Sequence, residues 1–237
     1  MGEHVDMHPL KFTRLSLLAA IGGVPLHAQA PSYPPFREYS MAHDAELALI
    51  KTAAPPSITG RSTLKVLTPN GYQVAHQGEN GFTCVVMRGW SAPTYTPEQF
   101  VGLTYEAAIR APICFDPIAS RTVLPYYELR SKLGMEGKTP AEIRDGVARA
   151  YANGTLPKRE GVSFAYMWSA DQHLGQGIGH WRPHVMVFAP FYTNDMVGGN
   201  AFGSPMPQLS DDAGTPFAVV VIPVDPSLAL KVQGGKP

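Results

Sequence analysis

Three histidines that fall within twelve residues give the strongest chemical signal in this chain. His173, His180 and His184 lie in a segment that also carries Asp171 and three glycines, whereas the remaining histidines are scattered. Imidazole nitrogens and carboxylate oxygens bind zinc and other divalent transition metals, and imidazole also transfers protons near neutral pH. The segment 171–184 is therefore the candidate site, with His173, His180, His184 and Asp171 as candidate metal ligands.

The spacing of these residues leaves three interpretations open. Pro183 disfavours a helix at the preceding residue, and in a strand His180 and His184 would lie roughly 13 Å apart on one side. Because ligand nitrogens lie about 2.0–2.1 Å from a zinc ion, both histidines can share one metal only if the chain bends at 181–183. The segment is then a metal site that activates a bound water, a metal-free acid–base or ligand site, or a structural element. In the structural interpretation His184 packs on a strand and its ring N–H bonds to the backbone.

Aromatic side chains give a second, weaker indication of a binding site. The chain carries no HExxH motif, no P-loop and no nucleophile elbow. Aromatics that line one cleft would indicate a small-molecule or glycan ligand, whereas aromatics spread through a core would only indicate a well-packed sheet. The residues concerned are Trp90, Tyr95, Tyr126, Tyr127, Tyr166, Trp168, Trp181, Phe191 and Tyr192.

Residues 1–30 are predicted to be a signal peptide. Lys11 and Arg14 precede an apolar stretch at 15–26 that is too short to span a bilayer, and Ala28 and Ala30 supply the small residues of a cleavage site. An uncleaved membrane anchor is the alternative. Since no later stretch is apolar for long enough to cross a membrane, we expect a periplasmic or secreted product without stable membrane insertion after cleavage.

The rest of the chain, 31–237, is expected to form a single domain. The sequence holds 19 basic and 19 acidic residues, and the leader removes two of each sign, so the mature chain stays neutral. No basic run is present, which argues against nucleic acid and anionic lipid as partners. The 23 prolines and 23 glycines are spread along the chain and indicate many turns.

The two cysteines, Cys84 and Cys114, are predicted to form a disulfide. Two cysteines in an exported chain are typical of one structural bridge, and two buried free thiols are the alternative. The closed loop of about 30 residues would contribute roughly 3–4 kcal/mol by restricting the unfolded chain.

Hydrophobic periodicity and turn residues predict an α+β fold. The expected helices are 38–54, 100–111, 124–133 and 139–153, of which the second and fourth begin with capping-box sequences. The expected strands are 62–68, 72–76, 82–88, 162–169, 184–190 and 217–224, the last of which is expected to be fully buried. The first three strands should form an antiparallel meander. We therefore expect a mainly antiparallel sheet of about six strands with three or four helices on one side, and a long loop at 194–214.

Three blocks of the sequence resemble a family of uncharacterised exported bacterial proteins. These blocks are 80–86 (NGFTCVV), 110–116 (RAPICFD) and 179–186 (GHWRPHVM). The resemblance covers about 38–191, and the family pattern has NGF-[TV]-C-L-V, APIC and GHWHPHLMF blocks in the same order. This chain departs from that pattern at Arg182, where a histidine is usual, so one candidate ligand is missing. The resemblance implies an exported bacterial protein and carries no activity.

These observations leave two classes of function. The first is a non-enzymatic binding or envelope-associated module in which the histidine segment serves the architecture. The second is a small metal-dependent hydrolase whose site lies at 171–184, with zinc or another divalent transition metal as its cofactor. The two differ in whether the imidazoles converge.

Overall fold

The fold is described from a computed structural model. The structure describes residues 33–90, 105–159, 161–175, 179–201, 203–209 and 213–233. The predicted signal peptide at 1–30 and the start of the helix predicted at 100–111 lie outside these ranges. No helix of the described residues has the length and apolar character needed to cross a membrane.

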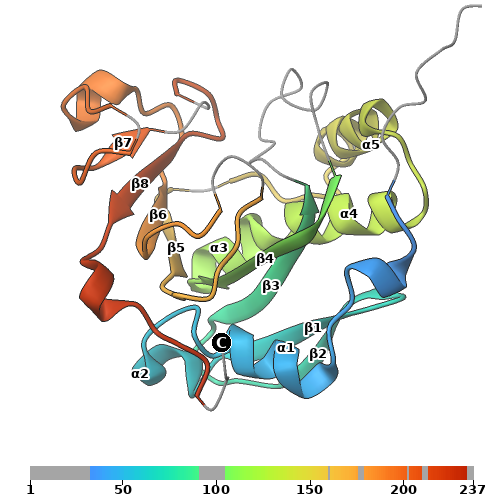
Figure 1. Ribbon diagram of the computed structural model, residues 1–237. Helices are drawn as coiled ribbons and strands as arrows, with labels where there is room; N and C mark the ends of the chain where they lie inside the picture. The colour runs from blue at the N-terminus through green and yellow to red at the C-terminus, as the bar shows by residue number, and fades with distance from the viewer. Residues whose placement is uncertain are drawn as a thin grey trace, which may run out of the picture.

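Eight strands form one mainly antiparallel sheet, as the α+β prediction requires (Figure 1). The strands are β1 (Thr63–Thr68), β2 (Gly71–His76), β3 (Thr83–Trp90), β4 (Tyr105–Phe115), β5 (Ser163–Met167), β6 (His184–Phe188), β7 (Gln208–Leu209) and β8 (Val219–Pro223). Their order across the sheet is β2-β1-β3-β4-β5-β6-β8-β7. All six predicted strands are present, and β4 and β7 are additional.

The structure confirms the predicted hairpin of the first two strands, but the prediction that the third strand continues it as a meander is wrong. β1 and β2 pair antiparallel around the predicted turn, where Gly71 has a φ of 92°. β3 does not pair with β2; it lies on the other side of β1 and runs parallel to it. Burial explains this choice, because Val85 and Val86 of β3 are completely buried, whereas β2 is largely exposed and suits the edge of the sheet.

The predicted helix at 100–111 is contradicted by β4, an eleven-residue strand that begins at Tyr105. Its alternate residues Ile109, Ala111, Ile113 and Phe115 all enter one core, which is the period-2 pattern of a strand. β4 pairs with β3 along most of its length and lies in the middle of the sheet. Pairing between distant segments therefore overrides the local capping sequence at 96–99.

Five α-helices and three short 3-10 helices complete the described fold. They are α1 (His43–Ile50), α2 (Pro56–Thr59), α3 (Pro117–Thr122), α4 (Leu124–Met135) and α5 (Pro140–Ala152), with η1 (Phe36–Glu38), η3 (Asn194–Val197) and η4 (Pro226–Leu228). α4 and α5 match the helices predicted there. The capping box of α5 is present, since the Glu142 N–H donates to Thr139 Oγ1 and the Thr139 N–H donates to Glu142 Oε2. The helix predicted at 38–54 is shortened to α1.

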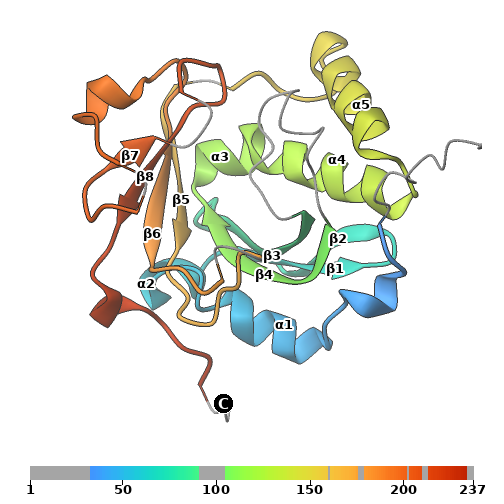
Figure 2. The same ribbon diagram turned by 45° about the horizontal axis from the view of Figure 1, so that its top comes forward.

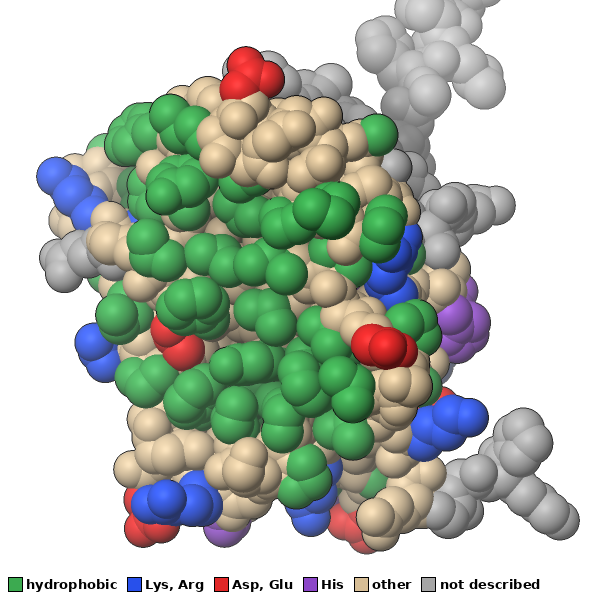
Figure 3. Space-filling view, turned by 90° about the vertical axis from the view of Figure 1, so that its left-hand side faces the viewer, with side chains coloured by type: hydrophobic (Ala, Val, Ile, Leu, Met, Phe, Trp, Pro, Cys, Tyr) green, Lys and Arg blue, Asp and Glu red, His purple; other side chains and the backbone are tan. Residues whose placement is uncertain are grey.

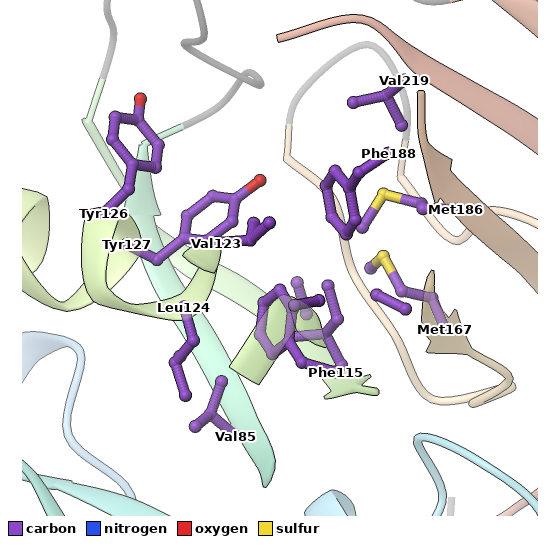
Figure 4. Close-up of a cluster of buried hydrophobic side chains, with 14 of the residues drawn as sticks. Val85, Phe115, Val123, Leu124, Tyr126, Tyr127, Met167, Met186, Phe188 and Val219 are labelled. Atoms are coloured by element: carbon purple, nitrogen blue, oxygen red, sulfur yellow. The ribbon is translucent and has the colours of Figure 1, made fainter. Parts of the chain in front are cut away.

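Helices cover both faces of the sheet, so the prediction that they lie on one side is wrong (Figure 2). α3, α4 and α5 pack over one face in the main core, which includes Val85, Phe115 and Phe188 (Figure 4). α1 packs on the other face, over Cys84, Val86 and Cys114. Because neighbouring residues of a strand point to opposite faces, β3 and β4 supply side chains to both cores.

The covering is incomplete beyond β5. The main core continues under β6 and β8 through Met186, Val219 and Val221. The opposite face of these strands carries a small cluster that includes Val187, Ala189, Leu209 and Val220, and none of the described α-helices contributes to it. The sheet therefore has one end that is covered on both faces and one end that is covered on a single face.

Candidate functional site

The histidine segment follows β5 as a tight turn beside β4. Arg110 and His173 exchange two backbone hydrogen bonds of 2.9 and 2.8 Å, so the segment extends the sheet next to β4. The turn closes through the Gly179 N–H, which donates to the Gly175 carbonyl at 2.8 Å. Gly175 has a φ of 97°, and a Cβ there would lie 2.8 Å from Glu106 Oε2. The φ value is what requires glycine here, because the end of the flexible Glu106 side chain can move aside, and the turn lies against this carboxylate of β4.

The structure brings together two of the four predicted ligands. The rings of His173 and His180 are perpendicular, with their centroids 5.5 Å apart. The Gly175 N–H lies 3.3 Å from His173 Nδ1, a contact in which this nitrogen is the acceptor. A histidine that binds metal through Nε2 usually donates its Nδ1–H to a partner. The observed contact therefore favours the tautomer in which Nε2 carries the proton.

His184 lies at the start of β6 in a different environment. Its side chain is 2% exposed, and its ring packs 4.6 Å from that of Trp181. Nδ1 lies 3.0 Å from the carbonyl oxygen of Arg182 and donates to it. Burial lowers the pKa of His184 to about 4, against which this hydrogen bond acts weakly in the other direction. His184 is thus a neutral, hydrogen-bonded histidine of the core at neutral pH.

Asp171 holds the end of the described chain. Its Oδ2 accepts a hydrogen bond of 2.8 Å from the Val232 N–H. Nearby, Leu230 pairs with Trp168 and Ala170 through backbone hydrogen bonds of 2.9 and 2.7 Å. The carboxylate therefore fixes the C-terminal segment 229–233 against the turn after β5.

The four predicted ligands thus occupy three separate surroundings. Within the described ranges, no three His, Cys, Asp or Glu side chains are grouped so as to hold a metal ion. The metal site at His173, His180, His184 and Asp171 stays a prediction, and its best-supported part is the pair of His173 and His180.

The predicted disulfide between Cys84 and Cys114 is confirmed. The two residues face each other directly across β3 and β4, with a Cα–Cα distance of 4.0 Å and a sequence separation of 30. Both are completely buried against α1. The bridge joins two neighbouring inner strands of the sheet and lies away from the solvent, which is typical of a structural disulfide.

A buried ion pair between α1 and β3 was not predicted. Arg88 Nη2 lies 2.7 Å from Glu46 Oε2, and both side chains are 1% exposed. Glu46 Oε1 also accepts the Leu67 N–H at 3.0 Å, and Arg88 Nη1 donates to the Val86 carbonyl at 3.1 Å. The two charges compensate each other in the interior, because an isolated buried charge would be very costly. The residues are 42 positions apart, and no local pattern links them.

The aromatic residues singled out in the sequence do not all line one cleft, and one of them, Tyr95, lies outside the described residues. Tyr126 and Tyr127 are buried in the main core, and their rings face Arg130 at 5.9 and 5.4 Å. Tyr192 instead lies on the surface of the other end of the sheet. A hollow of about 640 Å³ lies between α1, α2 and the C-terminal segment, with Asp44, Lys51 and Lys231 among its residues. The small-molecule or glycan ligand stays a prediction.

The largest unexpected feature is an exposed apolar surface, which we call the outer face. It consists of the outward side chains of β5, β6 and β8, of which Phe164 and Ile222 are exposed, Val185 and Val187 are half-buried, and Val220 is buried beneath them. They form two cross-strand rows, because Phe164 pairs with Val187 and Val187 with Val220, while Val185 pairs with Ile222. Figure 3 views this side of the molecule and shows a broad apolar area with few charged side chains.

A groove runs along the outer face. Its volume is about 310 Å³, and every lining residue is apolar or aromatic: Val162, Val187, Ala189, Tyr192, Val197, Pro207, Val220 and Ile222. β8 was predicted to be fully buried, but Ile222 is 37% exposed. The run of apolar residues at 217–224 predicts burial on both faces, which holds for Val219, Val220 and Val221 but not for Ile222.

Models of protein families, curated proteins and solved structures were all compared with the chain, and none of them matches.

Proposed function

We propose that the protein is a non-enzymatic binding module that works in a periplasm or outside the cell, and that the outer face is its binding surface. The exposed apolar groove between β5, β6 and β8 carries this proposal. Monomeric proteins rarely expose large contiguous apolar areas, and those that do generally use them for binding.

The distribution of exposed apolar side chains supports this surface over others. Ten large apolar side chains are strongly exposed among the described residues, and seven of them belong to the outer face or to the segments beside it. These seven are Val162, Phe164, Phe191, Tyr192, Met196, Met206 and Ile222. Scattered apolar residues on a surface are ordinary, but a concentration of this kind at one end of a sheet calls for a partner.

The disulfide supports the proposed compartment. A buried structural bridge between Cys84 and Cys114 forms and persists in oxidising environments, which include the periplasm and the exterior of the cell. The predicted signal peptide at 1–30 leads to the same places.

Site-specific photo-crosslinking in the native host tests this function. A photo-reactive amino acid would replace Ile222 on the outer face or, as the control, Val74, which is 51% exposed on β2 at the other end of the sheet. We expect a discrete crosslinked product from position 222 and none from position 74. Equal yields of diffuse products from both positions would rule out the outer face as the binding surface.

A second candidate function is that of a small metal-dependent hydrolase, which the approach of His173 and His180 favours; to bind an ion, His173 would have to give up its contact with the Gly175 N–H or the proton on Nε2. Rings with centroids 5.5 Å apart can share one ion, since two imidazoles on a tetrahedral zinc have centroids roughly 5 Å apart. Metal content of the mature protein, purified without a histidine tag, tests this function. Zinc that is lost in a His173→Ala/His180→Ala variant but kept in His76→Ala would support it. A protein that stays empty after addition of zinc would exclude it.

A further inference from the structure

We infer that the partner of the outer face is a second copy of this chain, packed face to face in a two-fold symmetric dimer. This inference rests on the proposed function, because it requires the outer face to be a binding surface. Four properties of that surface lead to it: its backbone, its charge, its shape and its size.

The backbone of the outer face restricts what can cover it. β6 lies between β5 and β8, so its N–H and C=O groups are used within the sheet. An extended peptide lying across this face would leave its own polar backbone groups unpaired on an apolar surface, which is costly. A second sheet brings a backbone that is already paired, and two sheets of this kind pack with interdigitating side chains about 10 Å apart.

The charge of the outer face suits a copy of itself. None of the residues that line its groove is charged, so two such faces can meet without repulsion between like charges. The chain as a whole is also neutral. A membrane surface fits less well, because interfacial binding to anionic lipid draws on lysine and arginine beside the apolar residues.

The shape of the outer face offers both a hollow and projections. The groove lies between β8 and the segment around η3, and Val197 of η3 forms part of its wall. Met196, the preceding residue, is 65% exposed, and Phe191 is 61% exposed beside the groove residue Tyr192. A two-fold interface requires that one surface contain both halves of each contact. The projecting side chains of one copy can therefore fill the groove of the other.

Phe191 adds a second observation that is independent of exposure. Its φ is 65°, and it is the one residue other than glycine with a positive φ in the described part of the chain. A bulky residue in this conformation is strained, and such strain is concentrated at functional sites. The backbone is held there by pairing, since the Phe191 N–H donates to the Thr215 carbonyl at 2.8 Å. The fold thus keeps an aromatic ring in solvent where glycine would be free of strain.

The size of the surface is sufficient for a dimer. Seven large apolar side chains, each about half exposed, present on the order of 700 Å² if a free side chain of this size exposes roughly 200 Å². A specific interface takes about 800 Å² from each partner. The neighbouring polar residues supply the remainder.

The dimer is tested by the mass of the purified mature chain, 31–237, in analytical ultracentrifugation from low micromolar to several hundred micromolar concentration. We expect a reversible dimer in the unmodified protein. Val187→Asp places a charge in the centre of the outer face and should raise the dissociation constant by at least about 100-fold, because the interface would bury an unpaired carboxylate. Val74→Asp on β2 is the matched control and should leave the dimer unchanged. Circular dichroism and thermal unfolding would show that both variants are folded.

A second variant keeps the inference testable if Val187→Asp fails to fold. Ile222→Cys adds one thiol to a chain whose two native cysteines are bridged, so a flexible thiol-reactive crosslinker should link two copies through position 222. Val74→Cys should give no such product.

A protein that is monomeric at all concentrations, or a dimer that Val74→Asp disrupts and Val187→Asp does not, would overturn the inference. The results that would contradict the proposed function differ from those that would contradict the dimer. If photo-crosslinking at position 222 yields a product with the mass of a different protein, the outer face is a binding surface and only the identity of the partner is wrong. If neither product nor dimer is found, both proposals fall.

Discussion

The two ends of the sheet differ in how their apolar faces are covered. At the end formed by β1, β3 and β4, side chains on both faces are buried, because α3–α5 cover one face and α1 covers the other. At the end formed by β6 and β8, the inner face enters the same main core, but Ile222 and the groove beside it remain exposed on the outer face. The strands of the exposed end are at least as apolar as those of the covered end, which carry Lys65, Arg88, Glu106 and Arg110. The difference therefore shows that the arrangement of the helices, and not the composition of the strands, decides which end stabilises the fold and which end is available for binding.

The strongest test of this contrast is the buried ion pair at the covered end. Glu46→Leu should lower the free energy of unfolding by about 3–5 kcal/mol, because it leaves the buried Arg88 guanidinium without its counter-charge. Denaturation in urea measures this loss. The double variant Glu46→Leu/Arg88→Met should recover most of the stability, since apolar residues often replace a buried pair without loss. A double variant as unstable as the single one would contradict this account of the pair.

The disulfide provides the next largest effect at the same end. Replacing Cys84 and Cys114 by alanine should lower stability by roughly 3–4 kcal/mol, because the separation of 30 residues closes a long loop in the unfolded chain. Thermal unfolding with and without reductant measures the same difference in the unmodified protein. Equal melting temperatures in the two conditions would mean that the bridge contributes nothing.

The burial of His184 predicts that the free energy of unfolding depends on pH. Its pKa is about 4 in the folded protein and 6.5 in the unfolded chain, so protonation favours unfolding. The stability that depends on the neutral ring is fully present above pH 6.5 and is lost as the pH falls towards 4, to a total on the order of 3 kcal/mol. Urea denaturation across this range, compared with His184→Gln, isolates the contribution. Glutamine can donate to the Arg182 carbonyl but does not titrate. Identical pH profiles would exclude His184 as the cause.

The smallest expected effect on stability comes from the same Val→Thr substitution made at each end of the sheet. Val85→Thr introduces a hydroxyl into the fully buried core and should cost about 1–3 kcal/mol. Val187→Thr has the same shape, but its hydroxyl lies in the open groove, so the cost should stay within about 0.5 kcal/mol. Both are measured at concentrations where the chain is monomeric. Similar losses at the two positions would show that the outer face is not open to water in the monomer.

The elements that were predicted correctly depend on neighbouring residues. The capping box of Thr139 and Glu142 places the start of α5, and the turn at Asn70 and Gly71 defines the first hairpin. The errors involve distant partners. The capping sequence at 96–99 predicted a helix where β4 pairs with β3, and the position of β3 beside β1 depends on burial that no local pattern encodes.

The predictions for the candidate site also succeed where neighbouring residues decide the outcome and fail where distant contacts do. The spacing of the cysteines and their exported context predicted the disulfide, which the structure confirms. The histidines are close in sequence, but the turn at Gly175 and the start of β6 at His184 carry them into different surroundings. The outer face was not predicted, because an apolar pattern on both sides of a strand indicates that both faces must be covered but does not show which segment or partner covers them. The cover can come from the same chain or from another one.

The strand order has a consequence for the time at which the fold can be completed. β8 lies between β6 and β7, although it is the last of the described strands along the chain. While the protein is being synthesised or exported, the free edge of β6 must therefore wait for residues 219–223 to emerge. An unpaired apolar edge is prone to join another chain during that interval. The nascent protein thus has a window in which a chaperone would protect it, and this window closes only when residues 219–223 can pair with β6.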